Sequence, residues 1–514
     1  METIVSAVTS DLLSRALSVV IQRCKRPKAE EAEHKLQRLQ RVLLRADAMV
    51  KEAEGRHIGN QAMLRQLEML RQAMYRGHYM LDTVKCRGQE GDGEVSSGLP
   101  VTLPRFSSAR HRLPSFPITS SKKNLKNTMP NTESLNKLEK MRNGLETLMD
   151  DMVEFTVFLE GYPRIPRQPY STYLILDKVM FGRQMEKETI INFLLRTGVA
   201  ACDESPKVLP IVGAAWVGMT TLIEHVCLDE RVREHFSSIV FFTEDDLGAQ
   251  GMASPLPPDI GVIKHQDLTA TSYGRSLSVI ELAGDMDEET WSRLYSSAAS
   301  SMAHGSKIIV ASRSEKISGL GTTQEALRLR HLPRDAYWYF FRTLVFGSAN
   351  HEDQPKLASL AMEIAALTNG TFLGANIMAS MMRANLNARF WSRLLQCLRD
   401  YTSRHLLMFG EHPADLIQKG RPVYACRMTQ QSQISILGGN IYQKGPYQKC
   451  STQNDVSKLT AQDIITGCVT HEGKFTALTW RSTIPPYYTY FVNCESQKAG
   501  CSTIGKKRPR QARF

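Results

Sequence analysis

The residues whose types and spacing could support chemistry surround a short loop between Gly213 and Gly218. An apolar, strand-like run, Val208 to Val212, enters this loop, and Thr220 and Thr221 follow it. The order matches the phosphate-binding pattern G-x-x-x-x-G-K-[ST], in which backbone N–H groups and a helix N-terminus hold phosphates while a lysine reaches the outer ones. The sequence therefore predicts a strand, a phosphate-binding loop and a helix.

One residue departs from this pattern, because Met219 occupies the lysine position. A charge-assisted hydrogen bond contributes roughly 1.5 to 3 kcal/mol, so its loss weakens triphosphate binding by about one to two powers of ten. Ala214 and Ala215 suggest a second penalty, since a position that needs positive φ or a close approach to phosphate is normally glycine. We expect ADP or ATP to bind weakly or not at all, with no metal beyond magnesium that accompanies a nucleotide. The alternative is an ordinary strand-turn-helix with incidental glycines.

Two further candidate site residues follow later strand-like runs. A nucleotide hydrolase uses two acidic residues there, one for the magnesium shell and one for the attacking water. Glu281 can supply the first carboxylate, but Leu282 stands where the second should be, and Asp285 comes too late in the chain. We therefore expect no ATP hydrolysis and assign no catalytic residue. Arg313 is well placed for a terminal phosphate, although an arginine after a strand is most often a surface residue.

These candidates need a parallel sheet to bring them together. Strand-like runs at Ile239 to Phe242, Leu277 to Leu282 and Lys307 to Val310 alternate with helical segments. This alternation is typical of a parallel sheet with helices on both faces, where ligands bind at the carboxyl ends of the strands. The sequence predicts such an α/β domain over residues 171–325, followed by a helical subdomain over residues 326–400.

The N-terminal part has helical periodicity. Its apolar residues recur at three- and four-residue spacing: Leu36, Leu39, Leu43, Ala46 and Val50, then Met63, Leu67, Leu70, Met74 and Leu81, after a first segment with Ile4, Val8, Leu12 and Val19. Such apolar faces must pack on one another, which predicts a helical bundle over residues 1–86. Whether the bundle also offers a face to a partner helix stays open. A basic Ser- and Pro-rich linker (87–132) and a helix with a Pro-rich connector (133–170) follow.

Beyond residue 400 the composition changes. Runs rich in β-branched and aromatic residues occur at Gln433 to Leu437, Lys474 to Trp480 and Tyr487 to Val492, and predict a β-containing region over residues 401–514 that ends in a basic tail. Thr460 with Asp463 could cap a short helix. The spacing of Cys468, His471, Cys494 and Cys501 does not match a zinc site, so we expect no structural metal.

The composition limits the class of protein. The 514 residues are 42% hydrophobic and 23% charged, with a net charge of +12, which is ordinary for a globular protein. No apolar run approaches the roughly 18 residues of a membrane span, and the N-terminus lacks a secretory signal. Ten cysteines without a repeating spacing indicate reduced thiols and a cytoplasmic location. The basic tail, Lys506 to Arg513, leaves nuclear import open and could bind an acidic partner or an import receptor.

Taken in order, the motifs resemble the plant disease-resistance proteins that combine a coiled-coil N-terminal domain with an NB-ARC nucleotide-binding domain (NLR proteins). The segments that carry this resemblance are Phe181 to Arg183, Gly213 to Leu222, Asp229 to Phe242, Gly305 to Arg313, Leu332 to Phe346 and Asn369 to Ala375. Met74 to Thr83 is similar to the segment that holds the acidic motif of the N-terminal bundle. The resemblance covers about residues 1 to 400.

The resemblance implies a signalling switch in which ADP holds an off state and ATP an on state, and a role in the defence response. It also implies that Gly218, Thr220 and Thr221 bind phosphate, that Glu281 lies beside the metal and that Arg313 senses the nucleotide.

The chain departs from the family at Met219, at Leu282 and at Phe372, which replaces a proline that lines the nucleotide pocket. The family's Met-His-Asp motif and leucine-rich repeats are not found in the sequence.

Three functions follow. The favoured one is a defence protein with a degenerate nucleotide site that acts through protein contacts, pairing its N-terminal bundle with other immune receptors or signalling proteins. The second is a true ADP/ATP switch in which another cation replaces the lysine. The third is a nucleic-acid binder that uses the basic linker and tail, with steep salt dependence as its signature.

Overall fold

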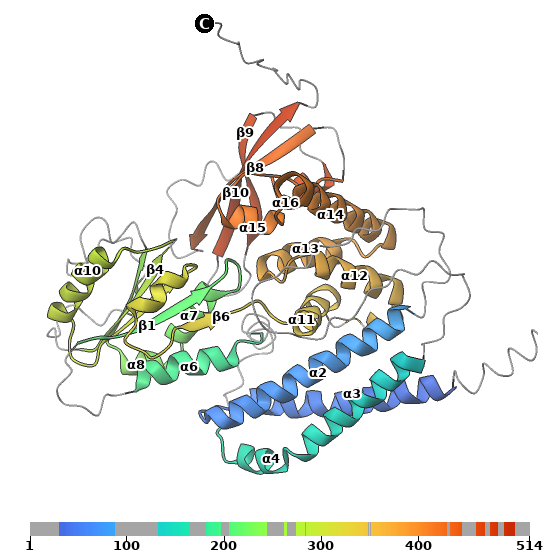
Figure 1. Cartoon of the computed structure of the whole chain (residues 1–514), viewed down its shortest axis with the longest axis horizontal. Coiled ribbons are helices and arrows are strands. Elements are labelled where there is room, and N and C mark those ends of the chain that lie inside the picture. Colours follow the sequence, from blue (N-terminus) through green and yellow to red (C-terminus); the bar gives the residue numbers. More distant parts are fainter. Residues whose placement is uncertain are drawn as a thin grey trace, which may run out of the picture.

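The computed structural model describes residues 30–87, 132–164, 181–196, 205–243, 262–264, 274–282, 284–347, 349, 351–428, 432–444, 459–467, 473–481 and 488–498. The predictions for residues 1–29, for most of the basic linker and for the basic tail lie outside these residues. The described residues form an N-terminal bundle, an α/β domain, a helical subdomain and a C-terminal sheet (Figure 1). No helix among them is both long enough and apolar enough to cross a bilayer.

The N-terminal bundle contains the helix of residues 30–54, α2 (Gln61–Arg87), α3 (Thr132–Asp150) and α4 (Val153–Glu160). Their apolar faces share one core, which includes Leu39, Leu43, Leu67, Leu70, Met74, Leu138, Leu145 and Phe155. The helical stripes predicted for residues 36–81 are confirmed. Because α3 and α4 bury their apolar faces in the same core, the bundle extends past the boundary expected at residue 86.

The α/β domain begins with α6 (Gln184–Leu195) and contains a six-stranded sheet. Its strands are β1 (Lys207–Gly213), β2 (Ser238–Thr243), β3 (Val262–Lys264), β4 (Ser276–Leu282), β5 (Lys307–Ser312) and β6 (Leu327–Leu329). The order is β3-β2-β4-β5-β1-β6, and every pairing is parallel except that of the edge strand β3. The predicted parallel sheet is confirmed, with β3 and β6 as additions too short to show in the sequence pattern.

Helices cover both faces of this sheet. Helices α6, α7 (Met219–Cys227) and α8 (Glu230–His235) pack on one face, while α10 (Glu288–Ser301) and the 3-10 helix η1 (Glu315–Leu320) pack on the other. Alternate residues of each strand point to opposite faces. The two apolar layers that result hold the carboxyl ends of the parallel strands at one edge, where the candidate site lies.

The helical subdomain lies between the bundle and the C-terminal sheet (Figure 1). It consists of α11 (Arg334–Phe346), the 3-10 helix η2 (His351–Asp353), α12 (Pro355–Leu367), α13 (Phe372–Ala384) and α14 (Ala388–Phe409). Trp338, Phe341 and Trp391 are fully buried at its centre. Helix α11 also packs directly against α2 of the bundle, so the N-terminal bundle and the subdomain form one continuous body.

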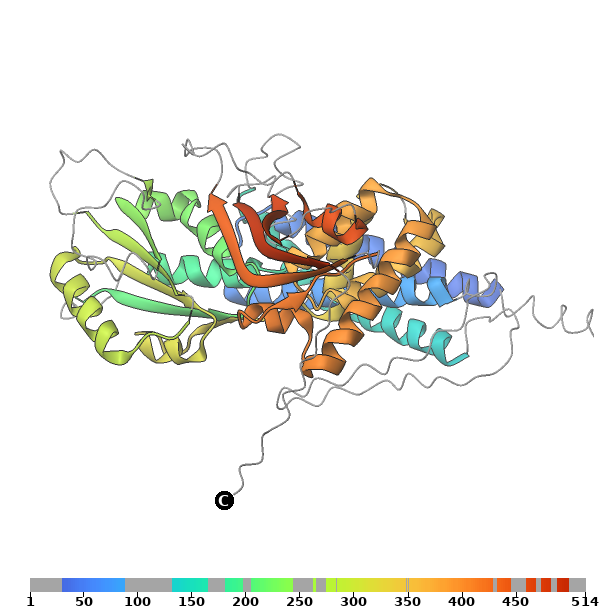
Figure 2. The same ribbon diagram turned by 90° about the horizontal axis from the view of Figure 1, so that it is seen from above.

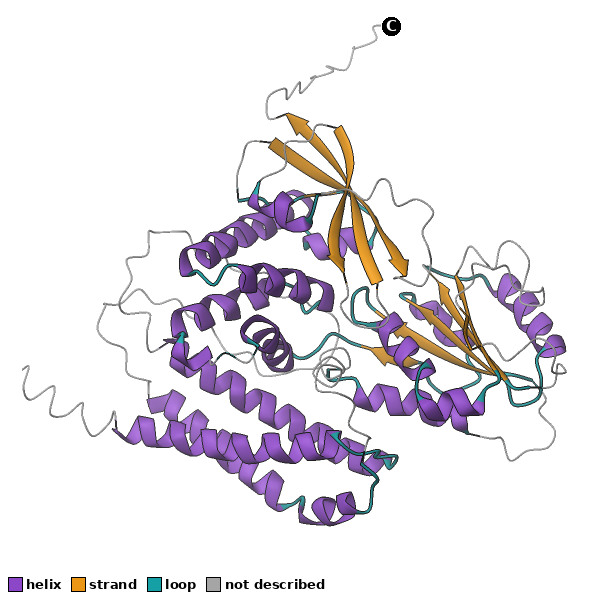
Figure 3. Cartoon of the chain, turned by 180° about the vertical axis from the view of Figure 1, so that it is seen from behind, coloured by secondary structure: helices purple, strands orange, loops and turns teal. Residues whose placement is uncertain are grey.

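The C-terminal region contains α15 (Pro413–Gln418), β7 (Val423–Tyr424), β8 (Ser432–Lys444), α16 (Ala461–Thr466), β9 (Gly473–Arg481) and β10 (Tyr488–Lys498). The strands form an antiparallel sheet in the order β7-β8-β10-β9 (Figures 2 and 3). This confirms the predicted β-containing region. The predicted cap is confirmed as well, because Thr460 and Asp463 form a reciprocal capping box on α16. The boundary expected at residue 400 falls inside α14.

Candidate functional site

The phosphate-loop motif folds as the strand, loop and helix that the sequence predicts. Strand β1 ends at Gly213 and α7 begins at Met219, directly after Gly218. Gly218 has a φ of 84°, which only glycine adopts without strain. The first N–H groups of α7 have no partner within the helix, and together with the helix dipole they favour an anion. The backbone of a phosphate site is therefore present.

The strained position of the loop is Trp216. Its φ is 61°, in the left-handed region, whereas neither Ala214 nor Ala215 has a positive φ. The positive-φ position of the loop is therefore Trp216 and not one of the alanines, whereas a close approach of Ala214 or Ala215 to a phosphate stays a prediction. A left-handed conformation costs a non-glycine residue roughly 1–2 kcal/mol. The surrounding contacts hold Trp216 there despite this cost.

Met219, in the lysine position, packs on the core of the α/β domain. Its side chain is half-buried and packs against the apolar cluster beneath α6 and α7. A thioether is a weak hydrogen-bond acceptor and carries no charge. The residue in the lysine position thus contributes to the core of the α/β domain and offers no cationic contact.

Phe372 lies against the loop from the side of the helical subdomain. Asn369 and Gly370, with φ values of 53° and 69°, form the turn that leads into α13. The Phe372 N–H then donates to the Trp216 carbonyl at 3.1 Å, and a Cβ on Gly218 would lie 3.5 Å from the Phe372 ring. The residue that the resemblance assigned to the nucleotide pocket therefore lies beside the loop. Its side chain is the aromatic ring of Phe372, where the family has a proline.

Arg183 holds the phosphate loop in place through hydrogen bonds, a role that the sequence did not reveal. This side chain is 5% exposed, and its guanidinium donates to the carbonyls of Val217 at 3.3 Å and Arg330 at 2.6 Å. It also pairs with Glu186 at 3.1 Å. The only signal in the sequence was the motif at Phe181 to Arg183, which does not identify the partners of the arginine. Arg183 thus holds the loop through the hydrogen bond that it donates to the Val217 carbonyl.

The sheet register brings the remaining candidates to one edge. Ser312 of β5 lies opposite Val212 of β1 and Leu282 of β4, so Gly213 and Arg313 follow at one level. Glu281 lies opposite Ala311, two residues before that level. Because strand residues alternate, Glu281 shares the face of α7, whereas Leu282 packs in the core under α10.

Asp285 is occupied elsewhere. Its carboxylate accepts hydrogen bonds from Ser314 and Lys316, at the start of η1. These contacts direct the Asp285 carboxylate toward η1. A second carboxylate next to Glu281 is thus not supplied by the residues that were considered for it.

Metal-ligating side chains do not cluster among the described residues. Within the described ranges no three His, Cys, Asp or Glu residues lie close enough together to hold a metal ion. Of the four residues considered for zinc, only Cys494 is described. It is fully buried in the C-terminal sheet, and burial raises the pKa of its thiol to about 11, which keeps the sulfur protonated.

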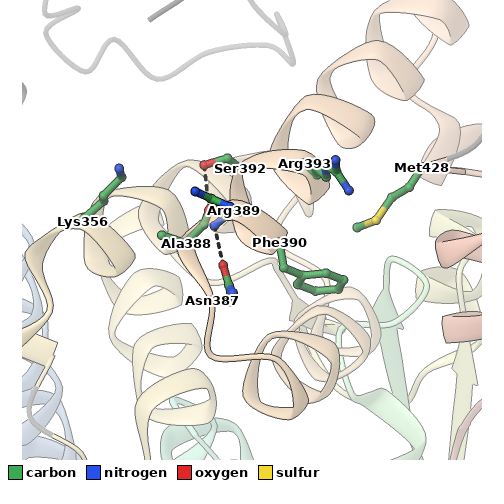
Figure 4. A pocket seen from close by; sticks show the side chains of 8 residues that line it. All are labelled: Lys356, Asn387, Ala388, Arg389, Phe390, Ser392, Arg393 and Met428. Carbon is green, nitrogen blue, oxygen red and sulfur yellow. Dashed lines mark hydrogen bonds between the residues drawn. The ribbon is translucent and has the colours of Figure 1, made fainter. Parts of the chain in front are cut away.

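A cavity of about 640 Å³ lies away from the phosphate loop. It is lined by Lys356, Asn387, Ala388, Arg389, Phe390, Ser392, Arg393 and Met428 (Figure 4). The Asn387 Oδ1 atom caps α14 by accepting from the Arg389 N–H at 2.8 Å, and the Ser392 hydroxyl donates to the Ala388 carbonyl at 2.8 Å. The charged side chains of the lining, Lys356, Arg389 and Arg393, are all cationic.

The fold and the site define a class of protein: an α/β fold with a phosphate-loop motif, which follows an N-terminal helical bundle in the chain and precedes a helical subdomain. The Rx N-terminal domain family matches residues 7–127. The disease resistance protein RGA2 of Solanum bulbocastanum is 21% identical over 375 residues, which cover 70% of this chain and 36% of that protein. The putative disease resistance RPP13-like protein 1 of Arabidopsis thaliana is 24% identical over 379 residues, which cover 71% of this chain and 34% of that protein.

These matches confirm the resemblance that the motifs predicted: the chain is similar to NLR-type plant disease-resistance proteins over most of its length. It spans about a third of the length of the curated relatives it matches. Among solved structures, a chain from Drosophila ORC bound to DNA matches with a TM-score of 0.24 and 11% identity, over 47% of this chain and 67% of that chain.

Proposed function

We propose that this chain is an NLR-like component of plant defence that acts through protein contacts, with a phosphate loop that no longer works as a nucleotide switch. The observation that carries the proposal is the Met219 side chain, which packs into the apolar cluster instead of providing a charge. The chain does not hydrolyse ATP in this proposal, and its location is the cytoplasm or the nucleus. The comparisons support the defence role through relatives that are themselves resistance proteins.

The residues of the site fit a nucleotide only in part. The loop backbone and the N-terminus of α7 suit a phosphate, which they would contact through N–H groups. Met219 lacks the charge for the outer phosphates, and the Phe372 ring lies next to Gly218. With the lysine contact absent, we expect ADP and ATP to bind about ten to a hundred times more weakly than they would with it.

One observation favours the second candidate, a working ADP/ATP switch. The loop keeps its shape although Trp216 must adopt a left-handed conformation, and such strain persists where the surrounding structure fixes it, often at functional sites. A switch would need another cation in place of the lysine. Arg183 is a buried cation that contacts the loop, but its guanidinium already donates to the Val217 and Arg330 carbonyls.

Calorimetric titration of the full chain with ADP and with ATP, in magnesium, separates the two candidates. The variant Met219→Lys restores the missing charge, and Met219→Leu is the matched control because it keeps the apolar contact. We expect the natural chain and Met219→Leu to show no binding at micromolar concentrations, and Met219→Lys to gain at least tenfold. Micromolar or tighter binding by the natural chain, or slow ATP turnover that Glu281→Gln abolishes, would support the switch instead.

The proposed protein contacts involve the N-terminal bundle. Helix α4 exposes the side chains of Val153, Val157 and Phe158 by 62%, 64% and 62%, and such apolar groups on one helix are typical of contact surfaces. The partner we propose is another immune receptor or signalling protein that offers an apolar helix. Co-purification with such a partner should be lost in Phe158→Glu and retained in the control Glu154→Gln, whose side chain shares the same helix.

The nucleic-acid alternative depends on the basic linker and tail, which lie outside the described residues. It therefore stays a prediction from the sequence. A steep loss of nucleic-acid binding between low and physiological salt would support it.

A further inference from the structure

Two thiols from separate elements lie together beneath the C-terminal sheet. The Cys397 Sγ atom of α14 is 2.9 Å from the Cys426 Sγ atom, which follows β7. Both cysteines are free and half-buried. Bonded sulfurs are about 2.05 Å apart, so a shift of less than about 1 Å would join these two.

Three hydrogen bonds hold the segment that carries Cys426. The Tyr424 N–H donates to His405 of α14 at 3.1 Å. The Ala425 N–H donates to the Ile434 carbonyl of β8 at 2.7 Å, and the Met428 N–H to the Ile465 carbonyl of α16 at 2.7 Å. Cys397 sits on a long helix. The two thiols therefore face each other because the fold holds both backbones, which lowers the entropic cost of joining them.

The two thiols differ in acidity. The hydrogen bond between the two thiols, helped by the Arg427 N–H, lowers the pKa of Cys397 although burial opposes it. The same bond and burial raise the pKa of Cys426. The nearby Asp400 carboxylate acts against ionisation of both, and the buried Tyr401 hydroxyl, with its raised pKa, stays neutral. We therefore take Cys397 as the thiol that ionises more readily, and a thiolate is the nucleophile in disulfide exchange.

A cationic cavity lies next to the thiol pair. Arg393 and Met428, which line it, are one helical turn before Cys397 and two residues after Cys426 (Figure 4). The cavity also presents Lys356 and Arg389, and none of its lining residues is acidic. A concentration of positive charge beside a reactive group raises the encounter rate with anions. The geometry selects a small anionic reagent.

We propose that Cys397 and Cys426 form a redox modification site that takes a small anionic disulfide of the glutathione type. The Cys397 thiolate attacks one sulfur of the reagent, breaks its S–S bond and releases one glutathione thiolate. Cys426 then loses its proton to solvent, its sulfur attacks that of Cys397, and the mixed disulfide breaks to release the second glutathione. The two protein thiols are oxidised to one disulfide, the reagent is reduced to two thiols, and the two protons end on these thiols.

The new disulfide would link α14 to the segment between β7 and β8. Helix α14 belongs to the helical subdomain and β7 and β8 belong to the C-terminal sheet, so the bond would tie the sheet to the subdomain. The inference is independent of nucleotide binding, because no residue of the phosphate loop takes part.

The test uses the full chain, incubated with glutathione disulfide, then alkylated, digested and analysed by mass spectrometry. We expect a Cys397–Cys426 linked peptide with a mass loss of two hydrogens, and the same result in the control Cys227→Ser. Cys426→Ser should accumulate glutathione on Cys397, because no second thiol resolves it. Cys397→Ser should leave Cys426 unmodified.

The role of the cavity is tested by the double variant Arg389→Gln with Arg393→Gln. Its reaction with glutathione disulfide should be several-fold slower than that of the natural chain, whereas its reaction with neutral hydroxyethyl disulfide should be unchanged. Equal slowing with both reagents would overturn the choice of an anionic reagent. The site itself is overturned if the oxidised natural chain shows no linked peptide, or if glutathione accumulates on both cysteines separately.

Discussion

The phosphate loop and the junction between α2 and α11 differ in the charged side chains that they contain. At the loop the backbone shape is kept, but a methionine replaces the charge and an aromatic ring lies beside the glycine. At the junction Asp82, which is 2% exposed, accepts hydrogen bonds from Trp338 at 2.8 Å, Arg342 at 2.8 Å and His351 at 3.0 Å. The lysine position of the loop thus holds an uncharged side chain, whereas the buried carboxylate at the contact between the bundle and the subdomain has three hydrogen-bond partners.

Apolar and surface contacts reinforce this junction. The Phe181 ring lies 5.2 Å from Tyr75 and 5.3 Å from Phe340, between the bundle and the subdomain. Lys85 pairs with Glu352 at 2.8 Å. A buried charge is tolerated only when its partners are in place. The junction therefore combines a buried ionic network with aromatic packing and a half-buried ion pair.

The largest expected effect comes from breaking the junction with Asp82→Ala. This change leaves the Arg342 charge buried without its carboxylate, so the free energy of unfolding should fall by about 3–5 kcal/mol. Urea unfolding followed by Trp fluorescence measures it, since Trp338 is a partner of Asp82. Asp151→Ala, at an exposed position of the same bundle, should change the stability by less than about 0.5 kcal/mol. Equal effects of the two variants would remove the contrast between loop and junction.

A smaller effect is expected from pH. His78 faces Arg342, Asp82, His351 and Lys51, and burial first, then the Arg342 charge, lowers its pKa to about 3. A histidine with a lowered pKa in the folded state stabilises the protein above pH about 6.5 and loses this contribution as the pH falls, by up to about 1.4 kcal/mol per pH unit. Asp82 does not titrate in this window, because the hydrogen bonds and charges of its partners outweigh burial and hold its pKa at about 2.

The measurement for His78 compares unfolding at pH 7 and pH 5. The natural chain should lose about 1–2 kcal/mol more than His78→Leu over this range. His57→Leu, which removes an exposed histidine of the same bundle, should leave the pH dependence unchanged. Parallel curves for the natural chain and His78→Leu would show that the junction does not shield this imidazole.

The smallest effect is expected in the loop, from Trp216→Gly. Glycine adopts the positive φ of this residue without strain, so the gain is about 1 kcal/mol before the lost contacts of the indole are counted. In the Met219→Lys background the same change should tighten ADP binding further, which calorimetry would show. If it weakens binding instead, the indole contributes to the nucleotide site and the loop is less degenerate than proposed.

Local patterns accounted for the elements that the sequence could predict. The stripes of α2, the strands of the α/β sheet and the capping box of α16 depend on periodicity or on residues three positions apart. Three-residue strands such as β3 and β6 have no such pattern, because their form depends on the neighbours they pair with. The sequence did not place α3 in the N-terminal bundle either. The sequence between α2 and α3 contains no pattern that indicates where α3 packs.

The sequence by itself determined the strand-loop-helix of the phosphate motif, the loss of its lysine and the family resemblance, because these features lie within a few consecutive residues. Only the tertiary structure decided that Trp216 is the strained residue, that Phe372 lies against the loop and that Arg183 fastens it. It also decided that Asp82 meets Trp338 and that Cys397 meets Cys426. These contacts join residues far apart in the chain, and which distant side chains meet is set by the packing of whole elements, not by their local pattern.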